Sequence, residues 1–418
     1  MNGKEKVQLS LNHQQGQGVA IDFGGTPVTG IHVLAIKNLR DYYGLENRPV
    51  KVVEPYQMLG EVDAELQEIM GVDTISVPSR KNMFGIENSN YKEFKTFWGQ
   101  TVLVPGDFNT EMDQNGDLII FPEGDMKAKP SAKMPKSSYF FDSIIRQGVI
   151  DDNNLSVEDN LEEFKQISAD DLNYLKTAIE NASNSNRAVV ANMGGTALGD
   201  IALVPAPFMK SPRGIRDVTE WYMSLMMRPD YVKEIFEKQT EIAVQNLQKL
   251  FDAVGNKIDV IFICGTDFGT QDSQFCDPQT FDEIYKPYYR KVNDWIHQNT
   301  SWKTFKHSCG AIEPLMQNII ESGFDIINPV QINAKGMDSK LLKEKYGSQI
   351  TFWGGGVDTQ KTLAFGTPAD VEKQVLEQCQ ILSQNGGFIF NTVHNIQANV
   401  PINNLVAMIN ALKKFNGK

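Results

Sequence analysis

Short apolar runs alternate with longer amphipathic stretches along most of the chain. Each run is rich in Val, Ile, Phe or Trp, and the runs span residues 71–77, 187–193, 200–206, 257–263, 302–307, 324–330, 349–355 and 386–392. Runs of this kind are typical of strands buried on both faces of a parallel sheet, and their alternation with helices gives βαβ units. Eight such strands predict an α/β fold, a (β/α)8 TIM barrel. An open doubly wound sheet is the alternative, but the glycine fingerprint of a dinucleotide site is missing.

Helical periodicity occupies residues 54–70, 168–182 and 221–254. Residues 98–125 instead hold two apolar runs around an Asn-Gly pair, which predicts a β-hairpin. His32 is expected to open a further helix. We therefore expect a single domain over residues 1–418. In it, residues 1–165 supply the first barrel strand and an α+β extension with a hairpin near the barrel mouth, and residues 166–418 supply the main part of the barrel.

Composition and charge exclude several classes of protein. With 418 residues, 41% of them hydrophobic and 22% charged, the chain can bury a full core. A net charge of −12 argues against a general nucleic-acid binder. No apolar run approaches the ~18 residues of a membrane span, and the first residues lack the apolar region of a signal peptide. Because its four cysteines are scattered without a framework spacing, we expect a reduced, cytoplasmic protein.

The barrel prediction gives the active site a location, because such barrels place it at the carboxyl ends of their strands. The polar residues that follow the predicted strands are Arg80, Asp267, Gln271, His307, Cys309, Asn328, Gln331, Asp358, Asn391, His394, Asn395 and Gln397. Two of the five histidines of the chain lie on this rim. The sequence therefore predicts a polar mouth at which His307, Cys309 and His394 converge.

His307 and Cys309 form a His-x-Cys pair at the end of an apolar run. Zinc takes Cys sulfur and His nitrogen, and a catalytic zinc has three protein ligands and an open position. A histidine from another loop, His394, would complete that number. The alternative is structural: Cys309 can be a small buried apolar residue and His307 a hydrogen-bonded core residue.

Asp267 lies in the segment GTDFGTQ, close to glycines at a strand end. A carboxylate there can act as a general acid or base or bind a cationic substrate, and it can equally cap a turn. Arg213 and Arg216 lie on a loop that could close over the mouth and bind a carboxylate or phosphate. Solvated loop charges are the alternative for this arginine pair.

Several longer segments resemble the uroporphyrinogen decarboxylase superfamily, specifically its branch of cobalamin-dependent methyltransferases. The resemblance is most specific in DFGTQ (267–271), FKHSCGAIEPLM (305–316), GFDIINPVQ (323–331), TFWGGGVDTQ (351–360), FGTPADV (365–371) and GGFIFNTVHNIQANVPINNL (386–405). Order and spacing agree over most of the chain. The resemblance implies a (β/α)8 barrel, in agreement with the strand count.

The resemblance also implies a zinc site. In thiol-methylating relatives, a His-x-Cys pair after a barrel strand and a later Cys bind a zinc that activates the acceptor thiol. His307 and Cys309 match the pair, and His394 occupies the position of the later Cys. Imidazole is an equally good zinc ligand, but this set has one fewer anionic ligand and makes a bound thiolate less nucleophilic. The thiol acceptor therefore does not carry over directly.

The implied function is a zinc-dependent methyltransferase that acts with a corrinoid protein on a small methylated substrate or a thiol. The chain has no D-x-H-x-x-G corrinoid-binding stretch, so cobalamin would arrive on a partner protein. Asp267 and His394 are the expected catalytic residues. The expected substrate-binding residues are Gln271, Asn328, Asn395 and Arg80, of which the two asparagines could instead support the site from behind.

Two alternatives stay open at this stage. The first is a decarboxylase-like lyase with Asp267 and His394 near a tetrapyrrole, because the decarboxylases carry a His near the position of His394. They lack the His-x-Cys pair, however, and place an aspartate after the first barrel strand, where this chain has SVPSRKNMFG (76–85). The second alternative is a non-catalytic protein that binds a corrinoid or porphyrin. Related decarboxylases form homodimers, but no interface signal decides the oligomeric state here.

Overall fold

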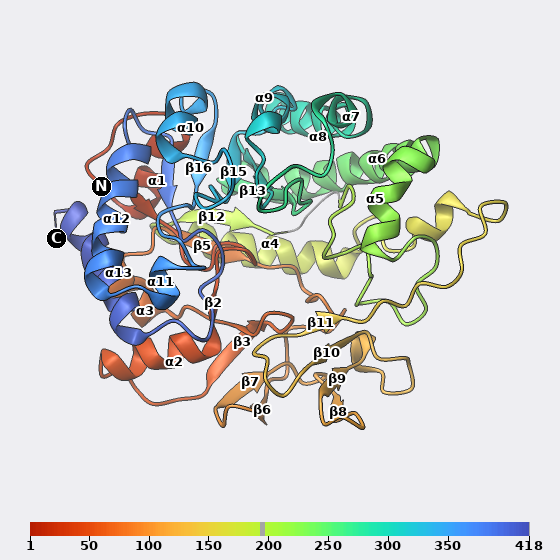
Figure 1. Ribbon diagram of the computed structural model, residues 1–418, viewed down its shortest axis with the longest axis horizontal. Coiled ribbons are helices and arrows are strands. Elements are labelled where there is room, and N and C mark those ends of the chain that lie inside the picture. Colours follow the sequence, from red (N-terminus) through yellow and green to blue (C-terminus); the bar gives the residue numbers. More distant parts are fainter. Residues whose placement is uncertain (193–196, 418) are drawn as a thin grey trace.

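The computed structural model describes residues 1–192 and 197–417. Its central sheet has eight parallel strands in the order β1-β17-β16-β15-β14-β13-β12-β5 (Figure 1). They are β1 (Ala20–Ile21), β5 (Thr74–Val77), β12 (Ala188–Ala191), β13 (Val260–Cys264), β14 (Lys303–His307), β15 (Ile326–Asn328), β16 (Thr351–Trp353) and β17 (Phe388–Phe390). The two ends of the sheet meet where the Asp73 N–H donates to the Ile21 carbonyl over 2.8 Å. The predicted (β/α)8 barrel is confirmed.

One predicted strand is wrong and another was missed. Residues 200–206 form turns, because the Asp200 carboxylate accepts the Ala202 N–H and the Asp200 carbonyl accepts the N–H groups of residues 203 and 204. Ala206 has φ = 48°, which a strand does not allow. The eighth strand is instead β1, near the amino terminus, so residues 1–165 supply two barrel strands. Met193, the last residue of the strand predicted over 187–193, lies outside the described residues.

Alternation along the strands divides the barrel interior into two layers. Apolar side chains fill the middle and form one cluster with Val7 and Leu11 of the amino-terminal helix α1 (Gly3–Leu11). Several strands contribute to it: Ala20, Val190, Val260, Phe305, Ile326, Trp353 and Ile389. Because side chains two residues apart lie on the same face, the next inward positions follow two residues later. In five of the seven strands this position is polar and buried: Asp22, Asn192, His307, Asn328 and Asn391. A polar layer thus covers an apolar plug at the carboxyl ends of the strands.

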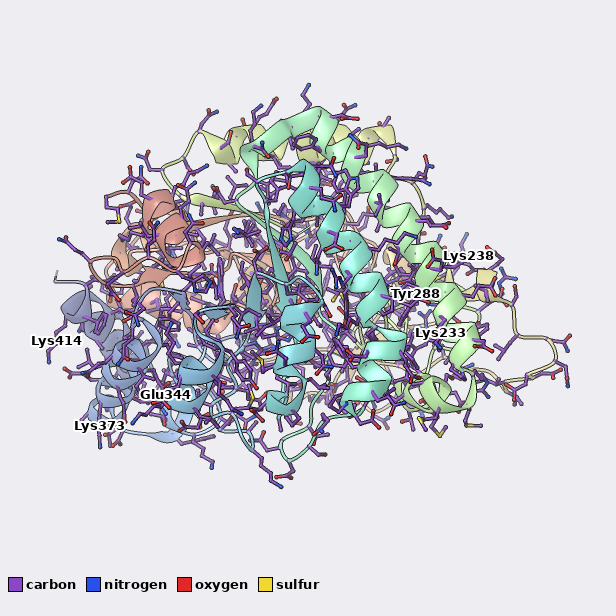
Figure 2. All side chains as sticks on the ribbon, turned by 90° about the horizontal axis from the view of Figure 1, so that it is seen from above. Lys233, Lys238, Tyr288, Glu344, Lys373 and Lys414 are labelled. Carbon is purple, nitrogen blue, oxygen red and sulfur yellow. The ribbon has the colours of Figure 1, made fainter. Side chains whose placement is uncertain are left out.

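Helices surround this barrel. They are α4 (Ala169–Ser183), α5 (Val218–Met227), α6 (Pro229–Val254), α7 (Pro278–Ile284), α8 (Lys286–Asn299), α9 (Met316–Glu321), α10 (Ser339–Tyr346), α11 (Thr362–Phe365), α12 (Pro368–Leu382) and α13 (Ile402–Phe415). The helix predicted over 168–182 is confirmed as α4. The pattern over 221–254 is two helices, because Pro229 disfavours the helical conformation of Arg228. Figure 2 labels Lys233 and Lys238 on α6, and the Lys238 ammonium pairs with Glu158 over 2.6 Å.

An extension precedes the third barrel strand and packs beside the barrel (Figure 1). One sheet contains β2 (Ile31–His32), β4 (Leu59–Gly60), β3 (Val50–Glu54), β7 (Thr101–Val104) and β6 (Lys92–Lys95), and α2 (Val33–Tyr42) and α3 (Ala64–Met70) belong to the same region. A second sheet contains β8 (Thr110–Met112), β9 (Leu118–Ile120), β10 (Ala132–Met134) and β11 (Asp142–Ser143). The predicted hairpin is β8–β9.

The helix predicted over 54–70 is correct only for α3. The Glu54 carboxylate accepts the N–H groups of Tyr56 and Gln57 and turns the chain from β3 toward β4. This turn also joins the extension to the barrel mouth, because the Gln57 side-chain oxygen accepts the Asn395 amide over 2.9 Å.

The described part of the chain has no helix long and apolar enough to cross a membrane. All four cysteines lie within it and are unpaired.

His32 gives the fold an acid-sensitive contact. It opens α2, as predicted: its Nδ1 accepts the Leu34 N–H over 3.1 Å, and its Nε2 lies 3.0 Å from the Tyr139 carbonyl, to which it can donate. Burial lowers the pKa of His32 to about 4, whereas an unfolded histidine titrates near 6.5. The unfolded chain therefore takes up a proton that the folded chain does not, and stability falls as the pH drops from about 6.5 to about 4.

Between pH 7 and pH 4 we expect the unfolding free energy of wild type to fall by ~3 kcal/mol more than that of His32→Asn, a variant that keeps a side-chain acceptor at the helix start. Urea denaturation of chelator-treated protein at several pH values measures this difference. Equal pH dependence in wild type and variant would contradict it.

Candidate metal centre

Three side chains from two distant parts of the chain meet at the barrel mouth. His307 is the last residue of β14, Cys309 follows two residues later, and His394 lies in the loop after β17. One potential ligand atom from each residue lies within 4.8 Å of the other two. The Cys309 sulfur is 3.4 Å from His307 Nε2, and the two imidazole centroids are 5.5 Å apart. The structure thus brings together the three residues predicted to converge.

The proton position on His307 follows from its neighbour Asn328 on β15. The Asn328 amide nitrogen donates to the Trp353 carbonyl over 2.7 Å, which turns the amide oxygen toward His307. That oxygen lies 2.7 Å from His307 Nδ1, and because it can only accept, Nδ1 carries the proton. His307 Nε2 is then the free lone pair that faces Cys309. A hydrogen bond of this kind on the far nitrogen is how proteins orient a metal-binding histidine.

His394 is held differently. Its Nδ1 accepts the N–H of Asn395 over 2.8 Å, so the neutral ring carries its proton on Nε2. A metal bound through Nδ1 would replace this hydrogen bond, and a metal bound through Nε2 would require the proton to move to Nδ1. In either case His394 must give up the hydrogen bond from the Asn395 N–H to bind a metal, whereas His307 needs no such change.

Burial sets the protonation of all three residues. It lowers the pKa of His307 and of His394 to about 4, so both imidazoles are neutral at pH 7, the form that binds metals. Burial, reinforced by the Asp267 carboxylate, raises the pKa of the Cys309 thiol, which is therefore protonated without a metal. A bound cation would favour the thiolate. Two imidazoles and one thiolate are a donor set that suits zinc and leave a fourth position open.

Asp267 contacts the cluster directly. Its Oδ1 accepts the Cys309 N–H over 2.6 Å and lies 3.7 Å from His307 Nε2. The Asp267 carboxylate does cap a backbone N–H, as one interpretation of the sequence expected. The N–H belongs to Cys309, after the neighbouring strand β14, and not to the turn that follows Asp267. Burial raises the pKa of Asp267. Tyr222 on α5, which sequence reasoning did not single out, donates its hydroxyl to the Asp267 carbonyl over 2.8 Å.

The predicted substrate-binding residues are all close to protein partners. Asn328 is buried against His307, which agrees with support from behind. The Gln271 oxygen accepts the Gln331 amide over 2.9 Å, and Gln331 in turn accepts the Gly310 N–H over 2.7 Å. Asn395 is buried, and its oxygen accepts the Gly30 N–H over 2.6 Å. Arg80 pairs with Glu87 over 2.5 Å. Direct substrate contact by these residues stays a prediction.

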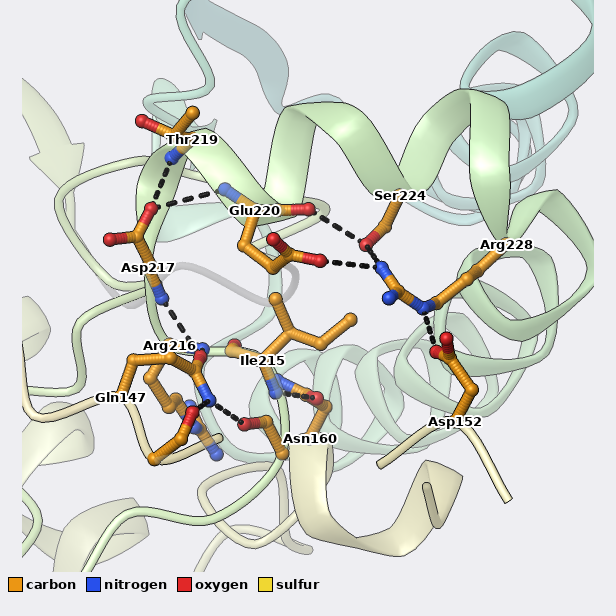
Figure 3. Close-up of polar contacts among 12 residues, drawn as sticks. Gln147, Asp152, Asn160, Ile215, Arg216, Asp217, Thr219, Glu220, Ser224 and Arg228 are labelled. Carbon is orange, nitrogen blue, oxygen red and sulfur yellow. Dashed lines mark hydrogen bonds and ion pairs between the residues drawn. The ribbon is translucent and has the colours of Figure 1, made fainter. Parts of the chain in front are cut away.

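The loop with Arg213 and Arg216 is anchored by its own network. Arg216 is 1% exposed and pairs with Glu163 over 2.8 Å, and Arg213 pairs with Glu162. Figure 3 shows Gln147 and Asn160 holding the backbone of residues 215–217 just before α5. Both arginines therefore already have carboxylate partners, and neither is free to bind an anion in this conformation.

Comparison with known proteins identifies the family. The family model described as "Uroporphyrinogen decarboxylase (URO-D)" matches residues 150–415, well over half of the chain. The chain belongs to the uroporphyrinogen decarboxylase family. A solved structure titled "methyltransferase from Methanosarcina mazei" covers 99% of both chains with a TM-score of 0.55 and 15% sequence identity, which shows that the two share a fold. No curated protein sequence matches this member of the family.

The contact between Asn328 and His307 can be tested by mutation. In Asn328→Leu the His307 ring loses its Nδ1 partner, and we expect zinc to bind ~10–100-fold more weakly at pH 7. Competition with a chromophoric chelator measures the affinity.

The matched control for this test is Asn404→Leu. Asn404 is a buried asparagine on α13 whose amide donates to two backbone carbonyls, those of Leu363 and Gly366. Equal zinc affinities in both variants would contradict the orienting role of Asn328.

Proposed function

We propose that this member of the family is a zinc-dependent methyltransferase that transfers a methyl group between a small methylated molecule and a corrinoid carried by another protein. The observation that supports this proposal most directly is the meeting of His307, Cys309 and His394 at the barrel mouth. A lyase that needs no metal has no evident use for a half-buried thiol beside two neutral imidazoles.

Each residue has a definable task in this proposal. His307, held by Asn328, presents Nε2 as a fixed ligand, and Cys309 supplies the single anionic ligand. When bound, zinc would act as a Lewis acid toward the methylated substrate at the open position. Asp267 is the acid closest to the cluster, and its raised pKa lets it hold or release a proton during transfer. Hydrogen bonding by Asp267 to the Cys309 N–H also fixes the backbone that carries the thiol.

The donor set bears on the class of substrate. Two neutral imidazoles and one thiolate leave the metal more electron-poor than a set with two thiolates. Such a centre would hold a bound thiolate tightly and lower its nucleophilicity. We therefore propose a small methylated donor, and not a thiol acceptor, as the molecule that binds at the mouth.

The arginines bear on the alternative of tetrapyrrole decarboxylation. The carboxylates of a porphyrinogen need cationic partners. Arg80 is tied to Glu87 and lies 3.4 Å from Asp171, and Arg216 is buried against Glu163. Because these arginines are already paired, they offer little positive charge to the carboxylates of a porphyrinogen. This supports methyl transfer over tetrapyrrole decarboxylation.

Elemental analysis of zinc-replete protein tests the metal. We expect about one zinc per chain in wild type, and loss of that zinc in Cys309→Ala and His394→Ala. Cys276→Ala is the matched control and should keep its zinc, because Cys276 is a free thiol in the same strand-end region but outside the cluster. Wild type without zinc would contradict the proposal.

Methyl transfer itself can be followed by absorbance. The zinc protein is mixed with cob(I)alamin and a panel of small O-, N- and S-methylated compounds, and methylcob(III)alamin formation is recorded. We expect formation with at least one donor class and none in Cys309→Ala. Metal-independent decarboxylation of a porphyrinogen, with no methyl transfer in the panel, would instead favour the lyase.

A further inference from the structure

A fully buried lysine lies directly behind the candidate metal centre. Lys306 precedes His307 on β14 and is 0% exposed. Because neighbouring residues of a strand point to opposite faces, His307 points into the barrel and Lys306 points out toward the surrounding helices. Its ammonium lies 5.0 Å from the ring centroid of Phe268 and 5.8 Å from that of Tyr289, a residue of α8. No carboxylate of the described residues lies within ion-pair distance of this ammonium, although the carboxylates of Asp200 and Asp267 interact with it electrostatically.

The hydrogen bonds of Lys306 join two strand ends. Its Nζ donates to the Thr266 carbonyl over 2.6 Å and to the His307 carbonyl over 2.5 Å. The pairing of β13 with β14 stops at Cys264 and Lys306, after an irregularity in β13. Beyond this last pair, the Lys306 ammonium joins the two chain segments by donating to one backbone carbonyl of each.

These two strand ends carry the groups of the metal centre. Thr266 immediately precedes Asp267, and His307 is itself a ligand candidate. The 3.7 Å between Asp267 Oδ1 and His307 Nε2, and the hydrogen bond from the Cys309 N–H to Asp267, both depend on how the two ends are placed. A contact that fixes the Thr266 and His307 carbonyls therefore fixes the position of Asp267 relative to His307 and Cys309.

A buried charge without a direct ion pair is costly, and apolar side chains of similar volume often replace buried charged groups without loss of stability. Packing alone therefore does not explain a lysine here. A methionine could fill the space between β14 and α8, but it could not donate to either carbonyl.

We propose that Lys306 is a positioning residue of the metal centre. Its ammonium holds the ends of β13 and β14 at the separation at which Asp267, His307 and Cys309 form the site. This inference rests on the proposed function, because it assumes that the cluster binds a metal.

The test uses Co²⁺ as a spectroscopic substitute for zinc in the full-length protein. We expect Lys306→Met to bind Co²⁺ ~10–100-fold more weakly than wild type and to change the visible ligand-field bands, which report coordination geometry. The matched control is Lys343→Met: Lys343 also donates to a backbone carbonyl, that of Gly386 over 2.5 Å, and its ammonium lies 6.0 Å from the Phe352 ring. The control should lose stability but keep the affinity and the spectrum.

A second pair of variants keeps the test decisive if Lys306→Met does not fold. Lys306→Gln retains one donor group and should bind Co²⁺ with intermediate affinity, compared with Lys343→Gln as its control. Wild-type affinity and spectrum in folded Lys306→Met, or unfolding of both Lys306 variants, would overturn the positioning role while leaving the proposed function intact. Absence of Co²⁺ binding to wild type would overturn the proposed function itself.

Discussion

The site depends on one geometric constraint, the two-residue period of β14 inside a packed barrel. Phe305 fills the apolar plug, so His307 must point into the mouth above it, and Lys306 between them must point outward. On the neighbouring strand β15, Asn328 pairs with His307 and therefore lies at the same level of the barrel. Because the amino-terminal helix α1 packs on the plug, the mouth with its polar side chains lies at the carboxyl ends of the strands. The chemistry of the mouth is therefore fixed by the core beneath it.

Within this frame the three candidate ligands are not equivalent. His307 and Cys309 belong to one strand end, where Asn328 fixes the imidazole and Asp267 fixes the Cys309 backbone. His394 comes from a loop, and its Nδ1 is engaged with the next backbone N–H. A metal would thus meet two ready positions and one that must rearrange. Burial keeps both imidazoles neutral and the thiol protonated, so the three side chains themselves carry little charge.

The sequence predicts the features that depend on hydrophobic periodicity and on the positions of strand ends. It does not predict features that depend on short strands, turns or contacts between different elements. Seven of the eight predicted runs contain barrel strands, because long buried runs stand out in a sequence. Strand β1 has only two residues and leaves no such signal, whereas 200–206 is apolar enough to resemble a strand although Asp200 turns it. The meeting of His307, Cys309 and His394 was predictable from their place on the rim. The hydrogen bonds of the Lys306 ammonium and the contact of Tyr222 with Asp267 were not predictable, because both join different elements of the fold.

The most direct test of the metal centre is X-ray absorption spectroscopy at the zinc edge on zinc-loaded wild type. A site made by His307, Cys309 and His394 predicts one sulfur at about 2.3 Å from zinc, with the remaining nitrogen or oxygen ligands at about 2.0–2.1 Å. A spectrum without sulfur, or with more than one, would contradict the account, because Cys309 is the single thiol in the cluster.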